Sequence, residues 1–281
     1  MPTVTRYLRC GTRTLELTRP LVMGVLNVTP DSFSDGGRYL SAAAAIEQGL
    51  RLAAAGAALI DVGGESTRPG AAPVSPAEEL RRVLPVIAGL RSQTTAFLSV
   101  DTSKPEVMAA AARAGADLIN DVRALREPGA LEAARASGCG VCLMHMQGEP
   151  RTMQQAPRYA DVVSEVRAFL AGRVQQCLGA GFAPERLLID PGFGFGKTFE
   201  HNLTLLRHLD ELTGGDVPLL VGLSRKSLVG KLTGRVGDER VYGSVALAVI
   251  ATLKGARIIR AHDVAATVDA LKVCAVLQEG G

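Results

Sequence analysis

Residues 57–68, AALIDVGGESTR, and residues 97–103, FLSVDTS, decide the fold of this chain. In each segment a short apolar run ends on polar residues, and a stretch that can form a helix follows. The same pattern recurs six times, at residues 21–28, 117–122, 139–145, 187–193, 218–226 and 256–262. Eight strands that alternate with helices can close into a (β/α)8 barrel, whose active site is built at the carboxyl ends of the strands. We therefore predict a single-domain α/β TIM barrel with one polar mouth.

The first residues predict a separate small element. Residues 7–17, YLRCGTRTLEL, hold two short runs around a Gly-Thr pair, which is the pattern of a β-hairpin. We expect residues 1–20 to form this hairpin and to close the floor of the barrel, and residues 21–281 to form the barrel. A chain of 281 residues with 47% hydrophobic content has the usual size of one such domain.

The charge balance argues against a nucleic-acid partner. The chain has 31 basic and 28 acidic residues, a net charge of +3, 4% aromatic residues and no Trp. Nucleic-acid-binding proteins usually carry a basic stripe and stacking aromatic side chains. No apolar run reaches the roughly 20 residues of a membrane helix, and residues 1–20 lack the apolar core of a signal peptide. We expect a cytoplasmic protein that binds neither nucleic acid nor a membrane.

The cysteines are interpreted as reduced structural thiols, because they are odd in number and scattered through core segments. The five are Cys10, Cys139, Cys142, Cys177 and Cys274. Cys139 and Cys142 form a CxxC pair, but positions i and i+3 of an extended strand point to opposite faces. Their sulfurs therefore cannot converge on one metal ion.

Several helices have recognisable ends. Ser75, Pro76 and Glu78 fit an N-cap, a proline in the first turn and a capping-box glutamate. Asp263 is placed to cap the last helix. A glycine in the left-handed conformation commonly ends a helix. Such glycines are expected at Gly56, Gly115, Gly138, Gly181 and Gly255.

Basic residues at the last strand exits predict an anion site. Side chains alternate between the two faces of a strand, so Arg260 and His262 lie on one face of the eighth strand. Barrels of this kind often hold phosphate after strands seven and eight. With Arg68 and the Thr67 hydroxyl, they would bind phosphate or pyrophosphate, because the guanidinium fork matches that geometry. The alternative for Arg260 is an ion pair inside the mouth.

Acidic and amide groups end the third, fourth and sixth strands. Asp101, Asn120 and Asp190 would converge in a partly buried pocket. Three acceptors suit a flat heterocycle with several N–H donors, such as a 2-amino-4-oxopyrimidine ring. Buried carboxylates require partners, and Lys226 could supply one. The alternative is a structural Asp–Lys network without a ligand.

The glycine-rich segment 191–198, PGFGFGKT, is not interpreted as a nucleotide-binding loop. A phosphate loop requires glycine five positions before Gly196, where Pro191 stands. The third glycine also arrives one residue too early for GxGxxG. We interpret this segment as a tight turn beneath Asp190 that lets a ligand approach, with Phe195 as a stacking or wall residue.

Two long segments resemble the signature loops of dihydropteroate synthases. They are NVTPDSFSDGG at residues 27–37 and DVGGESTRPG at residues 61–70. The loops that overlap them, residues 29–40 and 63–74, are rich in Gly, Pro, Ser and Asp, which is the composition of mobile lids. The resemblance continues through SVDTSKP, INDV, LMHMQG, IDPGFGFGK, GLSRKS and RAHD. The chain is therefore identified as similar to this family over nearly its whole length.

The resemblance implies a folate-biosynthesis transferase that joins 6-hydroxymethyl-7,8-dihydropterin diphosphate to 4-aminobenzoate, with Mg²⁺ assistance and loss of pyrophosphate. The implied pterin-binding residues are Asp101, Asn120, Met144, Asp190, Gly222, Lys226 and Arg260. The implied pyrophosphate-binding residues are Asn27, Thr67, Arg68, Arg260 and His262, with Asn27 also as the Mg²⁺ ligand. The implied aminobenzoate-binding residues are Thr67, Pro69, Phe195, Lys226 and Ser227. The residues expected to be catalytic are Asp101, Lys226, Arg260, His262 and Phe33.

The resemblance also implies a homodimer, and we expect its contact to use late helices such as those over residues 241–253 and 264–277. Three other readings differ in their chemistry. A non-catalytic paralogue would release no pyrophosphate. A pterin-binding methyltransferase domain would have no diphosphate for Arg68 and His262 to hold. A Schiff-base aldolase using Lys226 would be trapped by borohydride with a carbonyl substrate.

Overall fold

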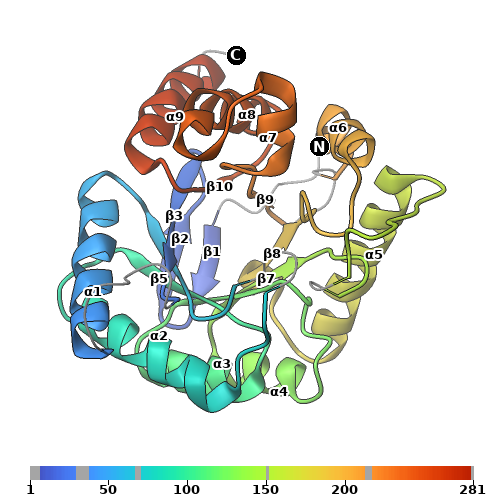
Figure 1. The fold of residues 1–281 in the computed structure, drawn as a ribbon. Helices are drawn as coiled ribbons and strands as arrows, with labels where there is room; N and C mark the ends of the chain where they lie inside the picture. Colours follow the sequence, from blue (N-terminus) through green and yellow to red (C-terminus); the bar gives the residue numbers. More distant parts are fainter. Residues whose placement is uncertain (1–6, 30–37, 67–70, 150–151, 213–216, 280–281) are drawn as a thin grey trace.

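The strands form a closed ring in the computed structural model, which describes residues 7–29, 38–66, 71–149, 152–212 and 217–279. Eight parallel strands lie in the order β8-β7-β6-β5-β4-β3-β10-β9. A parallel bridge between Ile189 of β8 and Leu219, the residue before β9, closes the ring, which Figure 1 shows end on. The strands are β3 (Leu21–Asn27), β4 (Leu59–Gly63), β5 (Phe97–Asp101), β6 (Leu118–Asp121), β7 (Gly140–Met144), β8 (Leu187–Asp190), β9 (Leu220–Val221) and β10 (Ile258–Ala261). The predicted (β/α)8 barrel is confirmed.

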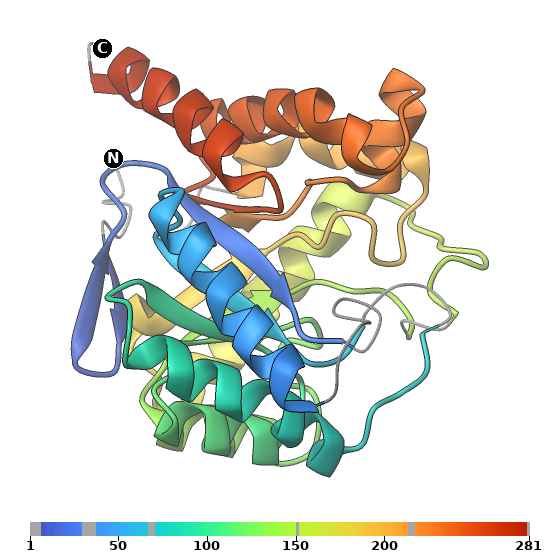
Figure 2. The same ribbon diagram turned by 60° about the vertical axis from the view of Figure 1, so that its left-hand side comes forward.

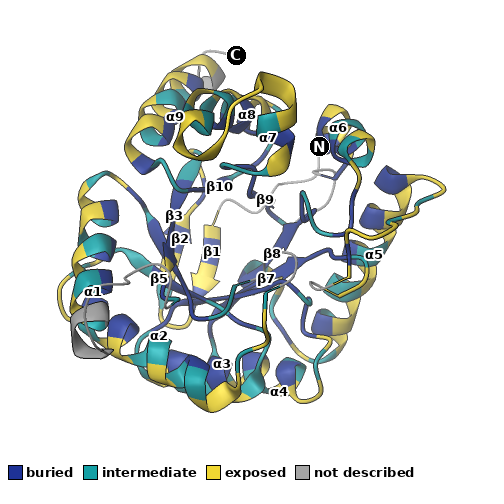
Figure 3. Ribbon diagram, viewed as in Figure 1, coloured by how far each residue is buried: buried dark blue, intermediate teal, exposed yellow. Residues whose placement is uncertain are grey.

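Helices surround the ring, with their buried residues turned toward the strands and their exposed residues outward, as Figure 3 shows. The α-helices are α1 (Arg38–Ala54), α2 (Pro76–Arg91), α3 (Pro105–Arg113), α4 (Ala130–Ser137), α5 (Val162–Gly179), α6 (Phe199–Arg207), α7 (Ser227–Thr233), α8 (Val241–Leu253) and α9 (Val264–Glu279). Short 3-10 turns are η2 (Pro184–Arg186), η3 (Leu209–Leu212) and η4 (Gly237–Arg240). Within the described ranges, no helix is both long and apolar enough to cross a bilayer.

The helix ends follow the sequence signals with two corrections. The Ser75 hydroxyl accepts a hydrogen bond from the Glu78 N–H at 3.3 Å, and Pro76 begins α2. The Glu78 carboxylate, however, pairs with arginines of the next turn and does not complete a capping box. The Asp263 carboxylate pairs with Arg225 instead of serving as the predicted cap, because a guanidinium satisfies it better than a helix N–H does.

All five predicted helix-ending glycines have a positive φ, as expected of left-handed caps. They are Gly56, Gly115, Gly138, Gly181 and Gly255. Each therefore adopts a backbone conformation in which a side chain would be strained.

A two-stranded antiparallel hairpin covers one end of the barrel. It consists of β1 (Tyr7–Cys10) and β2 (Arg13–Glu16), joined at Gly11, whose φ is 62°. Figure 2 shows it at the end opposite the loop that leads to α2. One fully buried cluster joins the hairpin to the strands and contains Leu8, Cys10, Leu15, Leu17, Met23, Leu59, Leu118, Cys142, Leu188, Leu220 and Ile258. The hairpin thus packs on the floor of the barrel, while the proposed division of the chain into two units at residue 20 stays a prediction.

The cysteines are all free and buried in the structure, as the sequence analysis expected. Burial and the nearby Asp117 charge raise the pKa of Cys10 to about 12. Burial also raises the pKa of Cys142 well above its ordinary value. These thiols are poor nucleophiles and belong to the core.

Candidate functional site

Strand register places four site residues in one row at the mouth of the barrel. Asn27 pairs with Gly63, Gly63 with Asp101, and Asp101 with Asn120, across β3, β4, β5 and β6. Gly63 has no side chain, and a Cβ built there would lie 3.8 Å from Asn27 Oδ1 and 3.9 Å from Asp101 Oδ2. The glycine therefore leaves a space bordered by two oxygen atoms.

Arg260 crosses the mouth and joins two acidic side chains. Its Nε donates to Asp61 Oδ2 at 2.7 Å, and its Nη2 donates to Asp101 Oδ2 at 3.1 Å. The Asn120 amide donates to the same Asp61 oxygen at 3.1 Å. The ion pair that was the alternative for Arg260 is thus present, and the hydrogen-bonding partner of Asp101 is Arg260, where the sequence analysis had proposed Lys226.

Asp61 was missed as a site residue by the sequence analysis. It is fully buried, and its Oδ1 has no hydrogen-bond partner among the described residues. The available signal was a single carboxylate inside an otherwise apolar run, two residues before the end of a strand. Because side chains alternate along a strand, Asp61 lies on the same face of β4 as Gly63.

Burial and repulsion from Asp61 perturb the pKa of Asp101. Desolvation and the negative charge of Asp61 raise the pKa of Asp101 to about 8, against the attraction of Arg260. Burial opposes the charge of Arg260, but Asp61 and Asp101 outweigh it and raise the arginine pKa. Arg260 therefore stays charged, and Asp101 can bind or release a proton near neutral pH.

Asp190 and Lys226 lie on either side of the seam that closes the barrel. Asp190 is the last residue of β8 and accepts a hydrogen bond from the Gly192 N–H at 2.7 Å. Burial raises the pKa of Asp190, and the positive charge of Lys226 partly opposes this. Burial lowers the pKa of Lys226 to about 8, against the attraction of Asp190. A Cβ on Gly222 would lie 3.8 Å from Lys226 Nζ and 3.7 Å from Arg260 Cβ, so this glycine also lines the mouth.

Apolar side chains form a wall beside these charges. Met144 is buried with Val122, Met146 and Met153, and the partly buried Phe195 packs against them. The ring centre of Phe195 lies 4.9 Å from Lys226 Nζ. A methionine and aromatic wall beside hydrogen-bonding groups suits a flat ring.

His262 and Ser227 complete the described part of the mouth. Both the backbone N and the Nδ1 of His262 lie 3.1 Å from Ser224 Oγ, which holds the imidazole at the end of β10. Ser227 is the exposed first residue of α7 and follows Lys226 directly. The predicted residues Phe33, Thr67, Arg68 and Pro69 lie outside the described residues.

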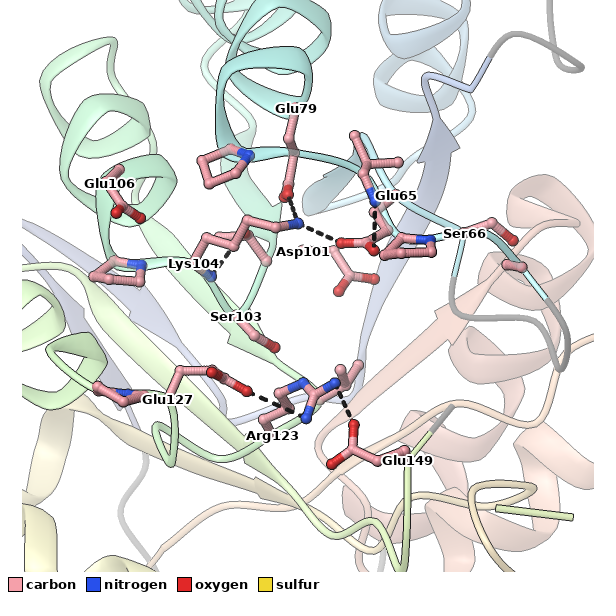
Figure 4. A pocket seen from close by; sticks show the side chains of 18 residues that line it. Glu65, Ser66, Glu79, Asp101, Ser103, Lys104, Glu106, Arg123, Glu127 and Glu149 are labelled. Atoms are coloured by element: carbon pink, nitrogen blue, oxygen red, sulfur yellow. Dashed lines mark hydrogen bonds and ion pairs between the residues drawn. The ribbon is translucent and has the colours of Figure 1, made fainter. Parts of the chain in front are cut away.

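A cavity of about 540 Å³ opens beside Asp101, between the loops that follow β4, β5 and β6. Figure 4 shows Lys104 in contact with both Glu65 and Glu79 across this cavity. Glu65 also accepts a hydrogen bond from the Val74 N–H at 3.1 Å. This ion-pair cluster therefore ties the two ends of the β4–α2 loop to the start of α3.

Comparisons with known proteins agree with this arrangement. The sequence model of the family described as "Pterin binding enzyme" matches residues 23–262. The dihydropteroate synthase of Escherichia coli strain K12 is 55% identical over 259 residues, which cover 92% of each chain. The chain belongs to the dihydropteroate synthase family. The resemblance recognised in the sequence is thereby confirmed.

Solved structures of dihydropteroate synthases match the fold as well. The Xanthomonas albilineans enzyme with 4-aminobenzoic acid has a TM-score of 0.92 and 55% identity, covering 98% of this chain and 99% of that one. The same organism's enzyme in complex with 7,8-dihydropteroate has a TM-score of 0.89 and 53% identity, covering 97% and 98%. The described mouth residues thus lie in a chain that shares the family's whole barrel.

Proposed function

We propose that this chain is a transferase that condenses 6-hydroxymethyl-7,8-dihydropterin diphosphate with 4-aminobenzoate to give 7,8-dihydropteroate and pyrophosphate. The observation that carries the proposal is the convergence of Asp101, Asn120, Asp190 and Lys226 with Arg260 in one barrel mouth. The E. coli and X. albilineans relatives at 53 to 55% identity carry the name of this enzyme. Acceptors for the ring and cations for the anion are thus available in one site.

The pterin ring is proposed to bind among the acidic and amide groups. Its amino and ring N–H groups would donate to Asp101 and Asp190, and Asn120 would bind an adjacent polar edge. Asp101 and Asp190 are both at least partly buried, so hydrogen bonds from a ligand would relieve their desolvation. Met144 and the space above Gly222 would take the two ring faces, with Arg260 covering one of them.

The diphosphate is proposed to lie at the opposite end, near Arg260 and His262, with Thr67 and Arg68 of the loop after β4. Asn27 Oδ1 would be a protein ligand to Mg²⁺, because the space above Gly63 is bordered by oxygen atoms and Mg²⁺ prefers oxygen ligands. When bound, Mg²⁺ would neutralise charge on the departing phosphate oxygens. Arg260 and His262 would stabilise the same developing charge by hydrogen bonding.

We propose a dissociative displacement. The bond between the exocyclic carbon and the diphosphate oxygen breaks, and its electron pair leaves with the pyrophosphate. The cation left on the carbon is delocalised into the pterin ring, where the Asp101 and Asp190 carboxylates stabilise it. The nitrogen lone pair of 4-aminobenzoate then forms the new C–N bond, and the nitrogen releases a proton to water. Opposite charges of the protein therefore lie at opposite ends of the breaking bond.

The aminobenzoate is proposed to stack beside Phe195 and Lys226, with Ser227, Thr67 and Pro69 around it and Phe33 contributed by the loop after β3. Its amine is neutral at pH 7, so attack requires positioning and exclusion of water more than a strong base. The wall of Phe195 and the methionines supplies a dry surface for the ring. Lys226, the N-cap residue of α7, would supply a positive charge for the carboxylate of the aminobenzoate.

We further propose a cytoplasmic homodimer that pairs through α8 and α9. Large apolar side chains on these helices are exposed to 84% at Tyr242, 55% at Leu253, 71% at Val276 and 70% at Leu277. Exposed apolar patches of this kind usually mark contact surfaces. Sedimentation of the purified chain would give twice the monomer mass of 29.4 kDa if the proposal holds.

The function is tested by pyrophosphate release that requires 4-aminobenzoate. Asp190→Asn should lower kcat/KM for the pterin diphosphate by about 30- to 1,000-fold, because a charged hydrogen bond and a cation-stabilising charge are lost, at about 2–4 kcal/mol. The exposed Asp210→Asn serves as a matched control, and its kcat/KM should stay at the wild-type value. Release that is independent of aminobenzoate, or wild-type kcat/KM in Asp190→Asn, would contradict the proposal.

A further inference from the structure

We propose that Lys197 is a positioning residue for the second substrate: with His145, it fixes the turn at residues 191–196, so that Phe195 and Lys226 keep the geometry that holds the aminobenzoate. The inference rests on the proposed function. Lys197 belongs to the segment that the sequence analysis had interpreted only as a tight turn. It makes its contacts from the protein side of that turn, where its side chain is 2% exposed.

The Lys197 ammonium group is at the centre of the turn. Its Nζ lies 2.9 Å from the Gly192 carbonyl oxygen, 3.1 Å from the Phe195 carbonyl oxygen and 2.9 Å from His145 Nδ1. Phe195 N–H also donates to the Gly192 carbonyl at 3.1 Å, which closes the turn on itself. One buried side chain therefore bonds to both ends of the turn and to the residue after β7.

The turn is also held by close backbone contact with a neighbouring segment and by a hydrogen bond from Gly194. Gly192 and Gly196 have φ values of 65° and 62°, and a Cβ on them would lie 1.9 Å from the His145 carbonyl oxygen and 2.2 Å from that of Gln147. The backbone of the turn thus lies directly on the segment after β7. Asn202 Oδ1 accepts a hydrogen bond from the Gly194 N–H at 2.8 Å and holds the far side.

The same turn supports two groups that face the proposed aminobenzoate site. The Phe193 carbonyl accepts a hydrogen bond from Lys226 Nζ at 2.5 Å, and the Phe195 ring lies beside the same ammonium group. Carbonyls of residues 192 and 195 therefore point to Lys197, while the carbonyl of residue 193 points to Lys226. Release of Lys197 would let the turn relax and would displace both Phe195 and the acceptor of Lys226.

The contacts of Lys197 are compatible with either charge state. Burial lowers the pKa of Lys197 well below its ordinary value. The pKa of His145 is lowered to about 3, mainly by burial and to a smaller extent by the positive charge of Lys197. A charged Lys197 donates to two carbonyls and to His145 Nδ1, whereas a neutral amine donates to the carbonyls and accepts from an Nδ1–H tautomer. The His145 imidazole can adopt the tautomer that matches the charge state of Lys197, so Lys197 keeps its three contacts with the turn and with His145.

The test compares the two substrates in the full chain. Lys197→Met keeps the length of the side chain and removes its donors, so the KM for 4-aminobenzoate should rise about tenfold or more, as misplaced positioning groups cause. The dissociation constant for the pterin diphosphate, measured without aminobenzoate, should change by a factor at least five times smaller than the change in KM. The ratio of the aminobenzoate KM to this dissociation constant should therefore rise. Val86→Ala, a buried truncation in α2 on another side of the barrel, controls for lost stability alone and should not alter the ratio of the two constants.

A second pair of variants tests the same idea at the partner residue. His145→Asn retains an acceptor near the position of Nδ1 and should keep the ratio within about threefold of wild type, whereas His145→Leu should raise it as Lys197→Met does. An unchanged ratio in both Lys197→Met and His145→Leu, or an equal change in Val86→Ala, overturns the inference alone. Absence of aminobenzoate-dependent release in the wild type overturns the proposed function, and the inference with it.

Discussion

The floor and the mouth of this barrel are built from the same strands but differ in the side chains that they bury, which are apolar at the floor and charged or polar at the mouth. At the floor, side chains such as Met23, Leu59 and Leu118 meet Leu8 and Leu15 of the hairpin in an entirely apolar cluster. At the mouth, the same strands end on carboxylates, amides and cations. One end contributes free energy of folding, and the other places charges where burial makes them costly.

The alternation of side chains explains how one strand serves both ends. On β4, Leu59 points to the floor cluster, and two residues later Asp61 occupies the next inward position and meets Arg260. The change from a leucine to a carboxylate therefore takes place between two successive inward-facing positions of the strand. The side chains that stabilise the fold and those that form the site are neighbours along the barrel axis.

Arg260→Met is expected to have the largest effect on stability and to break the division between the two ends. It would leave the fully buried Asp61 without its cationic partner, which should lower the free energy of unfolding by about 3–5 kcal/mol. Urea unfolding measures the loss, and Arg235→Met, at a 64% exposed arginine, should cost under about 1 kcal/mol. The double variant Asp61→Asn/Arg260→Met should regain part of the stability, and if it regained none, the uncompensated charge would not be the cause.

Leu8→Ala should sharpen the division from the other side. Leu8 is fully buried on the floor, so its truncation should lower the free energy of unfolding by about 2–5 kcal/mol. Because the hairpin lies at the end opposite the site, kcat/KM should stay within about twofold of wild type when assayed below the unfolding transition. A tenfold loss of kcat/KM with the fold intact would show that the floor supports the chemistry directly.

The pH dependence of kcat/KM for the pterin diphosphate should be bell-shaped, with a maximum near pH 8. Asp101 must be ionised, so activity should rise as pH increases toward its raised pKa of about 8. Lys226 must be charged, so activity should fall as pH increases past its lowered pKa of about 8. Lys226→Arg should move the basic limb to higher pH, and a basic limb that stayed in place would belong to another group.

Much of the barrel could be predicted from the sequence because its signals are local. A strand exit carries its own polar residue, as at Asp101 and Asp190, and five helices are followed by the predicted glycine with a positive φ. Ser75 could be recognised as a cap because its partner is only three residues away. Parallel strands then bring their exits together without any further information.

Most of the misses have a different cause. The exception is Glu78, whose carboxylate pairs with Arg81 and Arg82 of its own helix, so its competition is local. Asp263 was expected to cap a helix, but Arg225 approaches it from 38 residues away. Asp61 meets Arg260 across 199 residues, and Lys197 finds His145 across 52. Which of several donors reaches a buried carboxylate or carbonyl depends on side-chain placement in three dimensions, which motif spacing does not contain.

The seam that closes the ring has one more consequence. β9 is only Leu220–Val221, and a single bridge, Ile189 to Leu219, joins β8 to the segment that leads into it. Local opening begins where the fewest backbone bonds must break, so thermal breathing of the cylinder should start at this joint. Asp190 and Lys226 flank this joint. The distance between the Asp190 carboxylate and the Lys226 ammonium group should therefore be among the first to vary when the barrel opens.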